Sequence, residues 1–485
     1  MPIEIPQDLQ AQLRDYQEEG YRWMTRLAAW GAGACLADDM GLGKTVQTIA
    51  VLLNRANHGP SLVVAPASVV YNWQSEIERF APTLKVHILH VMSPDGTGER
   101  VSVANRGKGE ITTRRELIRS LSERDVLLTT YGLLVREQKA LTDKRWNVVC
   151  LDEAHTIKNR QTKMSQAAMG LRADFRIALT GTPLQNYLSE LWNLFQFINP
   201  GLLGSFESFS HDFITPIEVA HDKERQQTLR QILQPFLLRR TKAEVIDELP
   251  EKTEIIRRVE LSNGERVAYE AMRIEAQMQV AQASKVDVNV LASIMRLRQA
   301  ADSDSKLEDF VALLTQIVTG GNRVLVFSQF TSFLSAAQHR LESNSINGLT
   351  SNSPQDAPTS FYLDGSTPLA KRKQLVERFQ NGEAQVFFIS LKAGGLGLNL
   401  TGANYVIHLD PWWNPAIEQQ ATDRTYRIGQ HRNVTVYHLI AADTIEEKIL
   451  RLHKTKRDLA DALLQDQNTA QTLTLDDLKM LLEKK

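Results

Sequence analysis

The feature that most constrains the fold is an alternation of short apolar, β-branched runs with longer stretches of helical periodicity. The first half of the chain contains the runs SLVVA, LKVHILH, DVLLTT, NVVCL and FRIAL, which begin at residues 61, 84, 125, 147 and 175. Helix-like stretches such as YNWQSEIERF separate them. Strands that alternate with helices predict a parallel sheet with helices on both faces.

The second half repeats this pattern with RVLVFS, QVFFIS, NYVIHL and VTVYHLI, which begin at residues 323, 385, 404 and 434. A chain of 485 residues is also too long for one hydrophobic core. We therefore expect an α/β protein with two lobes. From about residue 190 to residue 300 helical patterns dominate, and we expect the aromatic residues there to pack helices together.

Two segments, residues 93–113 and 343–360, are rich in Ser, Gly, Asn and Pro and poor in apolar residues. Such a composition predicts surface loops. The two cysteines, Cys35 and Cys150, lie in short apolar runs and are expected to be buried in strands. Two cysteines make neither a disulfide framework nor a zinc site.

The overall charge excludes one class of nucleic-acid binder. The chain has 56 basic and 57 acidic residues, so it is not globally basic in the manner of a histone. Local basic strips could still bind nucleic acid, because binding depends on where the cations lie. We find no uncharged apolar run of the ~18 residues that a membrane span needs, and no apolar core of a signal peptide at the N-terminus. We expect a cytoplasmic, nucleoid-associated protein.

The stretch DDMGLGKT, residues 38–45, nearly matches the phosphate-loop pattern G-x-x-x-x-G-K-[ST]. Gly43, Lys44 and Thr45 fit the second half of the pattern, whereas Asp38 stands at the first glycine. The apolar run ACLA precedes it and a helical pattern follows, which is where free backbone N–H groups bind an anion. Lys44 would contact the β- and γ-phosphates and Thr45 would bind Mg²⁺. The alternative is an ordinary glycine-containing turn.

A second candidate motif, VVCLDEAHTIKN, places Asp152 and Glu153 directly after an apolar strand. Ligands of open α/β sheets bind at the carboxyl ends of the strands. Asp152 can hold Mg²⁺ through water, and Glu153 can polarise the attacking water. The alternative is two solvated acids at the start of a helix.

The second half contributes QQATDRTYRIGQHR, in which Arg424 and Arg427 are three residues apart. On a helix they would share a face, and two guanidiniums aimed at a phosphate stabilise transition-state charge. A solvated basic helix is the alternative. In the first half, ALTGTPLQN follows a strand and offers Thr180 and Thr182 beside Gly181, which suits a relay of nucleotide state.

In this order, these motifs resemble the Swi/Snf family of DNA-translocating ATPases of helicase superfamily two, from about Leu13 to about Arg457. The matching segments include LRDYQEEGYRWM, LADDMGLGKTVQ, VVAPASVVYNWQSEI, LDEAHTIKN, LTGTPLQN, FLLRRTKAEVIDELP, SLKAGGLGLNL and DPWWNPAIEQQATDRTYRIGQ. The resemblance implies two RecA-like lobes, residues 1–245 and 246–485. Helical protrusions would span about 190–245 and 256–300. A C-terminal helix, TIEEKILRLHKTKRDLADALL, would brace the second lobe or follow DNA.

The resemblance also implies roles for individual residues. Nucleotide binding would involve Gln17, which would read the adenine, and Asp38, Asp39, Met40, Gly41, Leu42, Gly43, Lys44 and Thr45. The metal would be held at Thr45 and Asp152. The catalytic set would be Lys44, Thr45, Asp152, Glu153, Gln420, Arg424 and Arg427. The DNA path would be lined by Trp73, Thr130, Ser328, Lys392 and Trp413.

Three departures from the family pattern are visible. Asp39 stands where the family usually has Glu, a loss of one methylene that we expect to be tolerated. The stretch LRQAADSDSKLEDF lacks a Cys-His-Pro tripeptide that many eukaryotic members carry, which favours a compact bacterial type. We also find no bromodomain-like or chromodomain-like module.

The function implied is a DNA-dependent ATPase that uses ATP and Mg²⁺, translocates on double-stranded DNA and remodels or displaces DNA-bound proteins without strong strand separation. RNA polymerase and other DNA-bound proteins are candidate targets, and the chain would be a monomeric motor or a motor subunit. One alternative is a strand-separating helicase, for which we identify no wedge. Another is a scaffold with an inactive ATPase site. The presence of every residue needed for hydrolysis argues against it.

The split of acids and arginines between the two halves generates a prediction. Lys44→Ala should abolish ATP hydrolysis because the phosphates lose their cation, and Arg427→Ala should do the same because the transition state loses a guanidinium. Steady-state phosphate release measures both. Full activity in Arg427→Ala would mean that the two halves do not share a site.

Overall fold

The computed structural model describes residues 3–482 except 68, 90–113, 182–187, 221, 246–249, 283–287, 347–358, 395–399, 413–414, 428 and 452–481. The chain divides into two compact units, residues 1–247 with 467–469 and residues 248–466 with 470–485. Within the described ranges, no helix is both long enough and apolar enough to cross a membrane.

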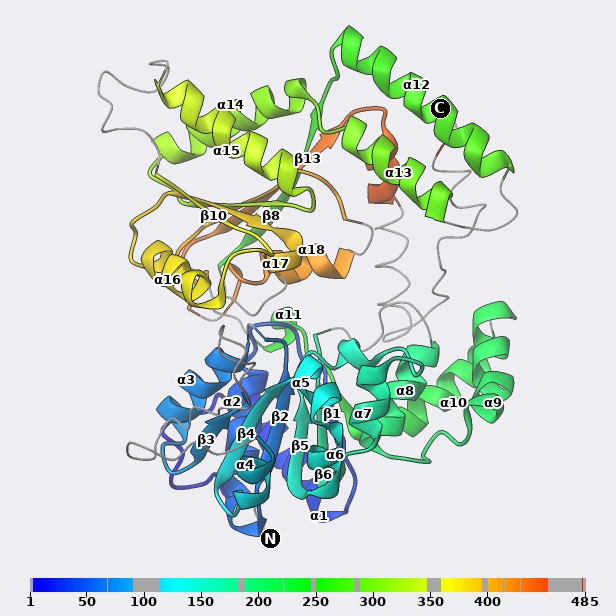
Figure 1. The fold of residues 1–485 in the computed structure, drawn as a ribbon, viewed down its shortest axis with the longest axis vertical. Helices are drawn as coiled ribbons and strands as arrows, with labels where there is room; N and C mark the ends of the chain where they lie inside the picture. The colour runs from blue at the N-terminus through cyan, green and yellow to red at the C-terminus, as the bar shows by residue number, and fades with distance from the viewer. Residues whose placement is uncertain are drawn as a thin grey trace. The chain divides into compact units, whose positions relative to one another are not determined.

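The first unit is built on a parallel sheet, shown from blue to green in Figure 1. Its described strands are β1 (Ala34–Leu36), β2 (Ser61–Ala65), β3 (Lys85–Ile88), β4 (Asp125–Thr130), β5 (Arg145–Leu151), β6 (Arg172–Leu179) and β7 (Leu237–Leu238). They lie in the order β3-β4-β2-β5-β6-β1-β7, and every pair is parallel. The predicted parallel sheet is confirmed, and the two cysteines are buried in β1 and β5.

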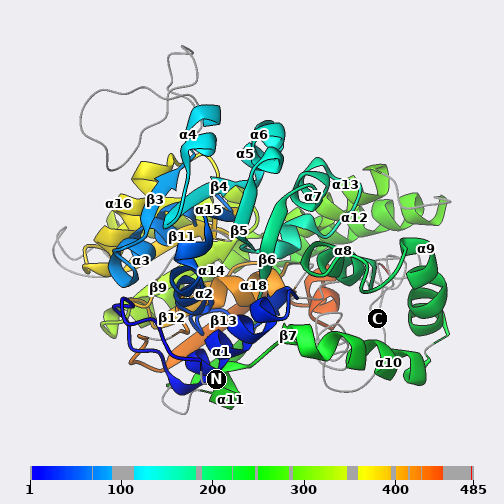
Figure 2. The same ribbon diagram turned by 90° about the horizontal axis from the view of Figure 1, so that it is seen from below.

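Helices cover both faces of this sheet, as Figure 2 shows. One face is covered by α1 (Asp15–Ala29), α2 (Lys44–Asn54) and α3 (Val70–Phe80). The other is covered by α4 (Arg114–Ser120), α5 (Tyr131–Arg136), α6 (Gln138–Asp143), α7 (Lys163–Met169) and α8 (Leu188–Ile198). Along β2, Val63 faces the first group and Leu62 and Val64 face the second. Because both faces are buried, the strands read as continuous apolar runs.

A helical protrusion follows α8. It contains α9 (Phe206–Phe209), the π-helix η3 (Ser210–Val219), α10 (Lys223–Leu233) and the short η4 (Gln234–Phe236). Phe195, Phe209, Ile217 and Leu229 form its core. The aromatic residues of this region therefore pack helices together, as the sequence predicted. Shorter helices complete the unit: η1 (Ala56–His58), η2 (Ala154–Ile157) and α11 (Lys242–Val245).

The second unit contains another parallel sheet, with the order β10-β11-β9-β12-β13-β8. Its strands are β8 (Lys252–Val259), β9 (Val324–Ser328), β10 (Ser360–Leu363), β11 (Val386–Ser390), β12 (Tyr405–His408) and β13 (Val434–Ala441). One face is covered by α14 (Asp304–Thr319) and α15 (Thr331–Ile346). The other is covered by α16 (Leu369–Gln380), α17 (Leu391–Gly394) and α18 (Pro415–Thr422).

Two long helices, α12 (Asn263–Gln282) and α13 (Val288–Ala300), form the protrusion of the second unit (Figure 1). They pack against each other through Tyr269, Val280 and Ile294, and against Ile445 and Ile449 after β13. Residues 445–451 are helical, which agrees with the start of the expected C-terminal helix. Its remainder lies outside the described residues.

The structure corrects the sequence prediction at three places. β7 and β8 lie in a stretch where we expected helices to dominate. β8 pairs only with β13 among the described strands and most of its residues are exposed or half-buried, so it lacks the apolar run of a buried strand. The segment 343–360 is not entirely loop, because α15 continues to Ile346 and β10 begins at Ser360. Most of the loop predicted at 93–113 and the rest of this one fall outside the described residues.

A carboxylate at the start of α12 generates a prediction on pH. Burial alone would raise the pKa of Glu265, but hydrogen bonds from Ser305 and Ser262 outweigh it and lower this pKa to about 2. A lowered pKa stabilises the fold above the unfolded value, and the contribution is lost as the pH falls toward the folded value. Glu265→Gln should therefore lower the melting temperature at pH 7, and its gap from the unmodified protein should narrow below about pH 4.5.

Thermal unfolding between pH 7 and pH 3.5 measures this gap. Glu383→Gln, which removes an exposed partner of Arg378, is the control and should change the melting temperature little. A gap for Glu265→Gln that stays constant with pH would contradict the assignment.

Candidate functional site

The predicted phosphate loop joins β1 to the N-terminus of α2. Gly43 is the N-cap of α2 and has φ 77°, and Gly41 has φ 87°, a left-handed region that favours glycine. The N-cap residue is a glycine and so has no side chain to cap this helix, which leaves its first backbone N–H groups suited to bind an anion. Lys44 Nζ donates to the carbonyl oxygens of Asp38 (2.6 Å) and Asp39 (3.2 Å). The local geometry fits a nucleotide phosphate.

Helix α1 holds this loop in place. Gln17 Nε2 and Tyr16 Oη each donate to the carbonyl oxygen of Leu42, both at 3.1 Å. A Cβ on Gly43 would lie 2.4 Å from Gln17 Nε2 and would displace this side chain, and the positive φ of Gly43 also disfavours any other residue. Gln17, which the sequence assigned to adenine, therefore lies against the phosphate loop, and its side-chain oxygen accepts from the Arg14 amide at 3.0 Å.

The acid at the missing first glycine has a buried partner. The Asp38 carboxylate is fully buried and accepts from Arg240 Nε (3.0 Å) and Nη2 (2.6 Å). Arg240 also donates to the Tyr16 carbonyl oxygen and to Gln47 Oε1. This one guanidinium thus connects α1, the phosphate loop and the segment after β7. Sequence reasoning gave Arg240 no role, because spacing along the chain does not show that residues 38 and 240 meet.

Asp39 is turned toward the same segment. Its amide donates to the Arg240 carbonyl oxygen, and its carboxylate accepts from the Lys242 amide, both at 3.0 Å. The carboxylate of this residue therefore binds backbone at the start of α11. The shorter acid in place of the family's Glu makes a defined contact here.

The two acids of the DEAH motif follow β5. Asp152 Oδ2 accepts from Trp73 Nε1 at 2.8 Å and Oδ1 accepts from the Glu153 amide at 2.9 Å. Burial and the neighbouring Glu153 carboxylate raise the pKa of Asp152 to about 6, against the opposing effects of Trp73 and Lys44. Lys44 is therefore close enough to act on this carboxylate. Glu153 has φ 49° and ψ 53°, a strained conformation for a non-glycine residue that is typical of functional sites.

The described start of the ALTGTPLQN motif, residues 178–181, lies beside the phosphate loop. Thr180 is buried, and its amide donates to the Leu36 carbonyl oxygen at 3.2 Å. A Cβ on Gly181 would lie 3.0 Å from Met40 Cγ. The loop after β6 and the phosphate loop are therefore in contact. Thr182 lies outside the described residues.

The residues predicted to line a DNA path have unlike surroundings. Trp73 and Ser328 are both fully buried, so neither side chain reaches the surface in this structure. Ser328 donates to Asp410 Oδ2 at the carboxyl end of the second sheet. Thr130 is half-buried and caps α5 by accepting from the Leu133 amide at 3.2 Å. The Lys392 side chain and Trp413 lie outside the described part of the chain.

In the second unit, the expectation that Arg424 and Arg427 share a helix face is wrong. α18 ends at Thr422, and the backbone of residues 423–427 forms turns and bends. Gln420 is on α18 and 8% exposed, Arg424 is 2% exposed and Arg427 is half-buried. The two arginines therefore differ in environment.

Gln430 contacts this irregular backbone at Thr425. Its side-chain Nε2 donates to the carbonyl oxygens of Ala403 (2.8 Å), Thr401 (3.1 Å) and Thr425 (3.2 Å). Its Oε1 accepts from the next two backbone amides. One buried amide side chain thus links the turn at Thr425, the segment 401–403 and the backbone that follows Gln430. Sequence reasoning quoted this glutamine within RIGQ but assigned it no role.

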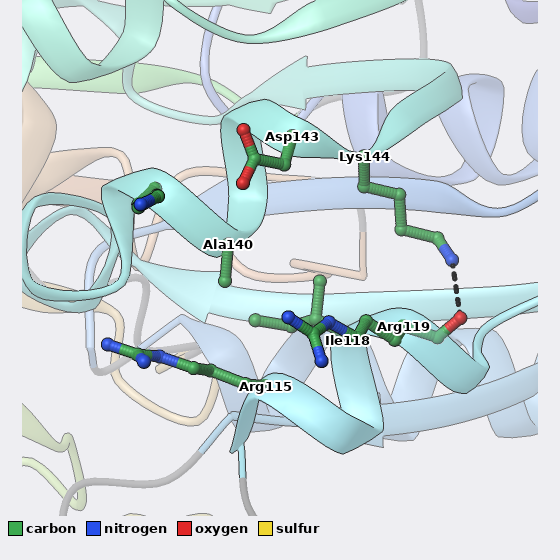
Figure 3. Close-up of a pocket in the computed structure, with 7 residues that line it drawn as sticks. Arg115, Ile118, Arg119, Ala140, Asp143 and Lys144 are labelled. Carbon is green, nitrogen blue, oxygen red and sulfur yellow. Dashed lines mark hydrogen bonds between the residues drawn. The ribbon is translucent and has the colours of Figure 1, made fainter.

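A separate pocket of about 500 Å³ lies between α4 and α6 (Figure 3). It is lined by Arg115, Ile118, Arg119, Lys139, Ala140, Asp143 and Lys144. Lys144 Nζ donates to the carbonyl oxygens of Leu121 (2.8 Å) and Arg119 (3.2 Å). Lys144 precedes β5 whereas Asp152 follows it, and a seven-residue strand spans roughly 23 Å. This basic pocket is therefore not part of the site at the phosphate loop.

Metal chemistry at the phosphate loop rests on few protein ligands. Among the described residues, no cluster of three or more His, Cys, Asp or Glu side chains could hold a metal ion. Mg²⁺ in nucleotide sites is usually bound by one or two protein oxygens together with substrate phosphates. The Asp152 carboxylate and the half-buried Thr45 are suitable oxygen donors in the same unit.

The Asp38–Arg240 pair generates a stability prediction. Arg240→Ala should lower the free energy of unfolding by about 3–5 kcal/mol, because it leaves a buried carboxylate without its cation. Urea unfolding measures the loss. Arg145→Ala is the matched control, since it removes the exposed arginine of the Arg145–Asp174 pair and should cost less than about 1 kcal/mol. Equal losses in both variants would contradict the role of burial.

Comparison with known proteins agrees with the motif order. The SNF2-related domain matches residues 16–306, and the helicase conserved C-terminal domain matches residues 305–429. YwqA of Bacillus subtilis, named provisionally as an ATP-dependent helicase/translocase, is 40% identical over 97% of this chain and 50% of its own length. An uncharacterized ATP-dependent helicase of Mycoplasma pneumoniae is 34% identical over 97% of this chain and 44% of its own.

A solved structure of the Sulfolobus solfataricus SWI2/SNF2 ATPase core in complex with dsDNA is 34% identical, covers 96% of each chain and has a TM-score of 0.47. The chain spans about half the length of the curated relatives it matches. The match of the first domain alone covers more than half of the chain. The chain therefore belongs to the SNF2-related family, and its second half carries a helicase C-terminal domain.

Proposed function

We propose that this chain is a DNA-dependent ATPase motor that couples ATP hydrolysis to translocation on double-stranded DNA. The observation that carries the proposal is the arrangement in the first unit. An uncapped helix N-terminus, Lys44 and the Asp152–Glu153 pair lie at one edge of one parallel sheet. Phosphate-binding amides, a cation and two acids are the groups that phosphoryl transfer requires.

Each group has a distinct task in this proposal. Lys44 would leave the carbonyls of Asp38 and Asp39 and bind phosphate oxygens. Asp152 and Thr45 would hold Mg²⁺, which neutralises charge on the β- and γ-phosphates when it is bound with ATP. Glu153 would orient the attacking water and accept its proton.

The second unit would complete the ATPase centre. Gln420, Arg424 and Arg427 are proposed to sense the nucleotide and to stabilise charge in the transition state. The requirement for both units explains why DNA should matter for the rate, since a duplex that aligns the units would favour the complete centre.

The DNA contact would be made mostly to phosphates, so binding should be independent of sequence and sensitive to salt. Displacement of DNA-bound proteins is the proposed outcome of translocation, with RNA polymerase and other DNA-bound proteins as candidate targets. This proposal places the motor at the bacterial nucleoid.

An ATPase assay with and without double-stranded DNA tests the proposal. We expect the rate to rise severalfold with duplex and to fall again as salt is increased, because counterions compete for the phosphate contacts. Equal rates with and without duplex would refute DNA dependence. A forked duplex in the same reactions should yield little separated strand, whereas efficient unwinding would favour a true helicase.

A further inference from the structure

Trp73 has a polar atom inside an otherwise apolar helix face. On α3 it lies with Val70 and Ile77 on the buried side, at the spacing of a helix that packs on a sheet. Its ring is 0% exposed. Its indole N–H nevertheless has a polar partner, the Asp152 carboxylate, to which it donates at 2.8 Å.

We propose that Trp73 is a positioning residue of the ATPase centre, which fixes the orientation of the carboxylate that would hold Mg²⁺. The inference rests on the proposed function of Asp152. It assigns to Trp73 a task at the nucleotide site in place of a direct contact with DNA.

The Asp152 carboxylate is oriented by hydrogen bonds on both of its oxygens. Among the described residues, each oxygen of Asp152 accepts one hydrogen bond, Oδ1 from the Glu153 amide and Oδ2 from Trp73. Rotation of the carboxylate would break both bonds. A carboxylate oxygen has about two acceptor positions, so one on each oxygen stays available for a metal-bound water.

The Trp73 side chain, which donates this hydrogen bond, is held rigidly. Trp73 is packed in the core, and its backbone amide donates to the Val69 carbonyl oxygen at 3.0 Å. On the other side, the Asp152 amide donates to the Val64 carbonyl oxygen of β2 at 2.8 Å, and Tyr131 Oη donates to the Asp152 carbonyl oxygen at 2.8 Å. Donor and acceptor are therefore both held by backbone around the end of β2.

A second buried tryptophan in the same unit offers a matched control. Trp146 is also 0% exposed, and its indole N–H donates to the Leu141 carbonyl oxygen at 2.9 Å. It lies near the start of β5, whereas Asp152 follows the end of that strand. Substitution of either tryptophan by Phe removes one indole hydrogen bond and a similar buried area, but only Trp73 contacts the metal-binding acid.

The first test compares the Mg²⁺ requirement of the two variants. Trp73→Phe should raise the Mg²⁺ concentration for half-maximal ATPase activity about tenfold or more, the usual effect of losing a partner of a metal ligand. Trp146→Phe should leave this concentration unchanged, although both substitutions should lower the melting temperature. An equal Mg²⁺ requirement in the two variants would overturn the proposal.

The second test does not depend on turnover or on the folding of Trp73→Phe. The seven tryptophans can be labelled with 5-fluorotryptophan. The Trp73 fluorine signal is the one that is absent from the spectrum of Trp73→Phe. If this variant does not fold, the signals of the other six tryptophans are assigned by single substitutions, and the remaining signal belongs to Trp73. With ADP present, a Mg²⁺ titration should shift the Trp73 signal and leave that of Trp146 in place. An unshifted Trp73 signal would overturn the inference. If the unmodified protein instead hydrolyses no ATP with or without DNA, the proposed function fails. The Mg²⁺ titration still shows in that case whether the metal binds beside the Trp73–Asp152 contact.

Discussion

The candidate site depends on a buried ion pair between two residues that are distant in the sequence. Asp38 and Arg240 meet inside the first unit, and the same guanidinium reaches the backbone of α1 and the side chain of Gln47 on α2. A buried pair of this kind adds little net stability, because desolvation offsets the attraction, but its loss on one side is costly. Its effect is to specify one arrangement of α1, the phosphate loop and β7. This explains why an acid occupies the position of the first glycine.

The groups around the loop are oriented by contacts within the protein. Tyr16 and Gln17 bind the loop carbonyl of Leu42, and Asp152 is held by two donors. Fixed dipoles and charges of this kind lower the reorganisation that a reaction requires. Burial and Glu153 also raise the pKa of Asp152 to about 6, which means that the fold tolerates a carboxylate in unfavourable surroundings. Perturbed acids of this type are common at functional sites.

Much of the architecture could be predicted because its signals are local. The buried strands are continuous apolar runs, and the phosphate loop and the DEAH acids are short motifs with a fixed place relative to a strand. β8 was missed because most residues of this edge strand are exposed or half-buried and half of them are charged, so it lacks a buried apolar run. The turns at 423–427 were read as helix because the spacing of two arginines cannot show that α18 ends at Thr422.

Long-range partnerships could not be predicted from spacing for the same reason. Nothing in the sequence around Trp73 shows that its indole meets Asp152, and the motif alone suggested a DNA contact. A similar case is the buried Lys306 of α14, which binds both carboxylate oxygens of Glu446 at 2.7 and 2.8 Å. Burial raises the pKa of Glu446, against the effect of Lys306. Such contacts appear only once the fold brings distant residues together.

We propose above all that ATP binds at the carboxyl ends of β1 and β5, where the phosphate loop with Gly43 and the acid Glu153 follow these strands. A crystal structure with a non-hydrolysable ATP analogue and Mg²⁺ tests it most directly. The account predicts the β- and γ-phosphates at the N-terminus of α2, bound by Lys44, with the metal beside Asp152 and Thr45. An analogue seated instead in the basic pocket between α4 and α6, with the phosphate loop empty, would contradict it.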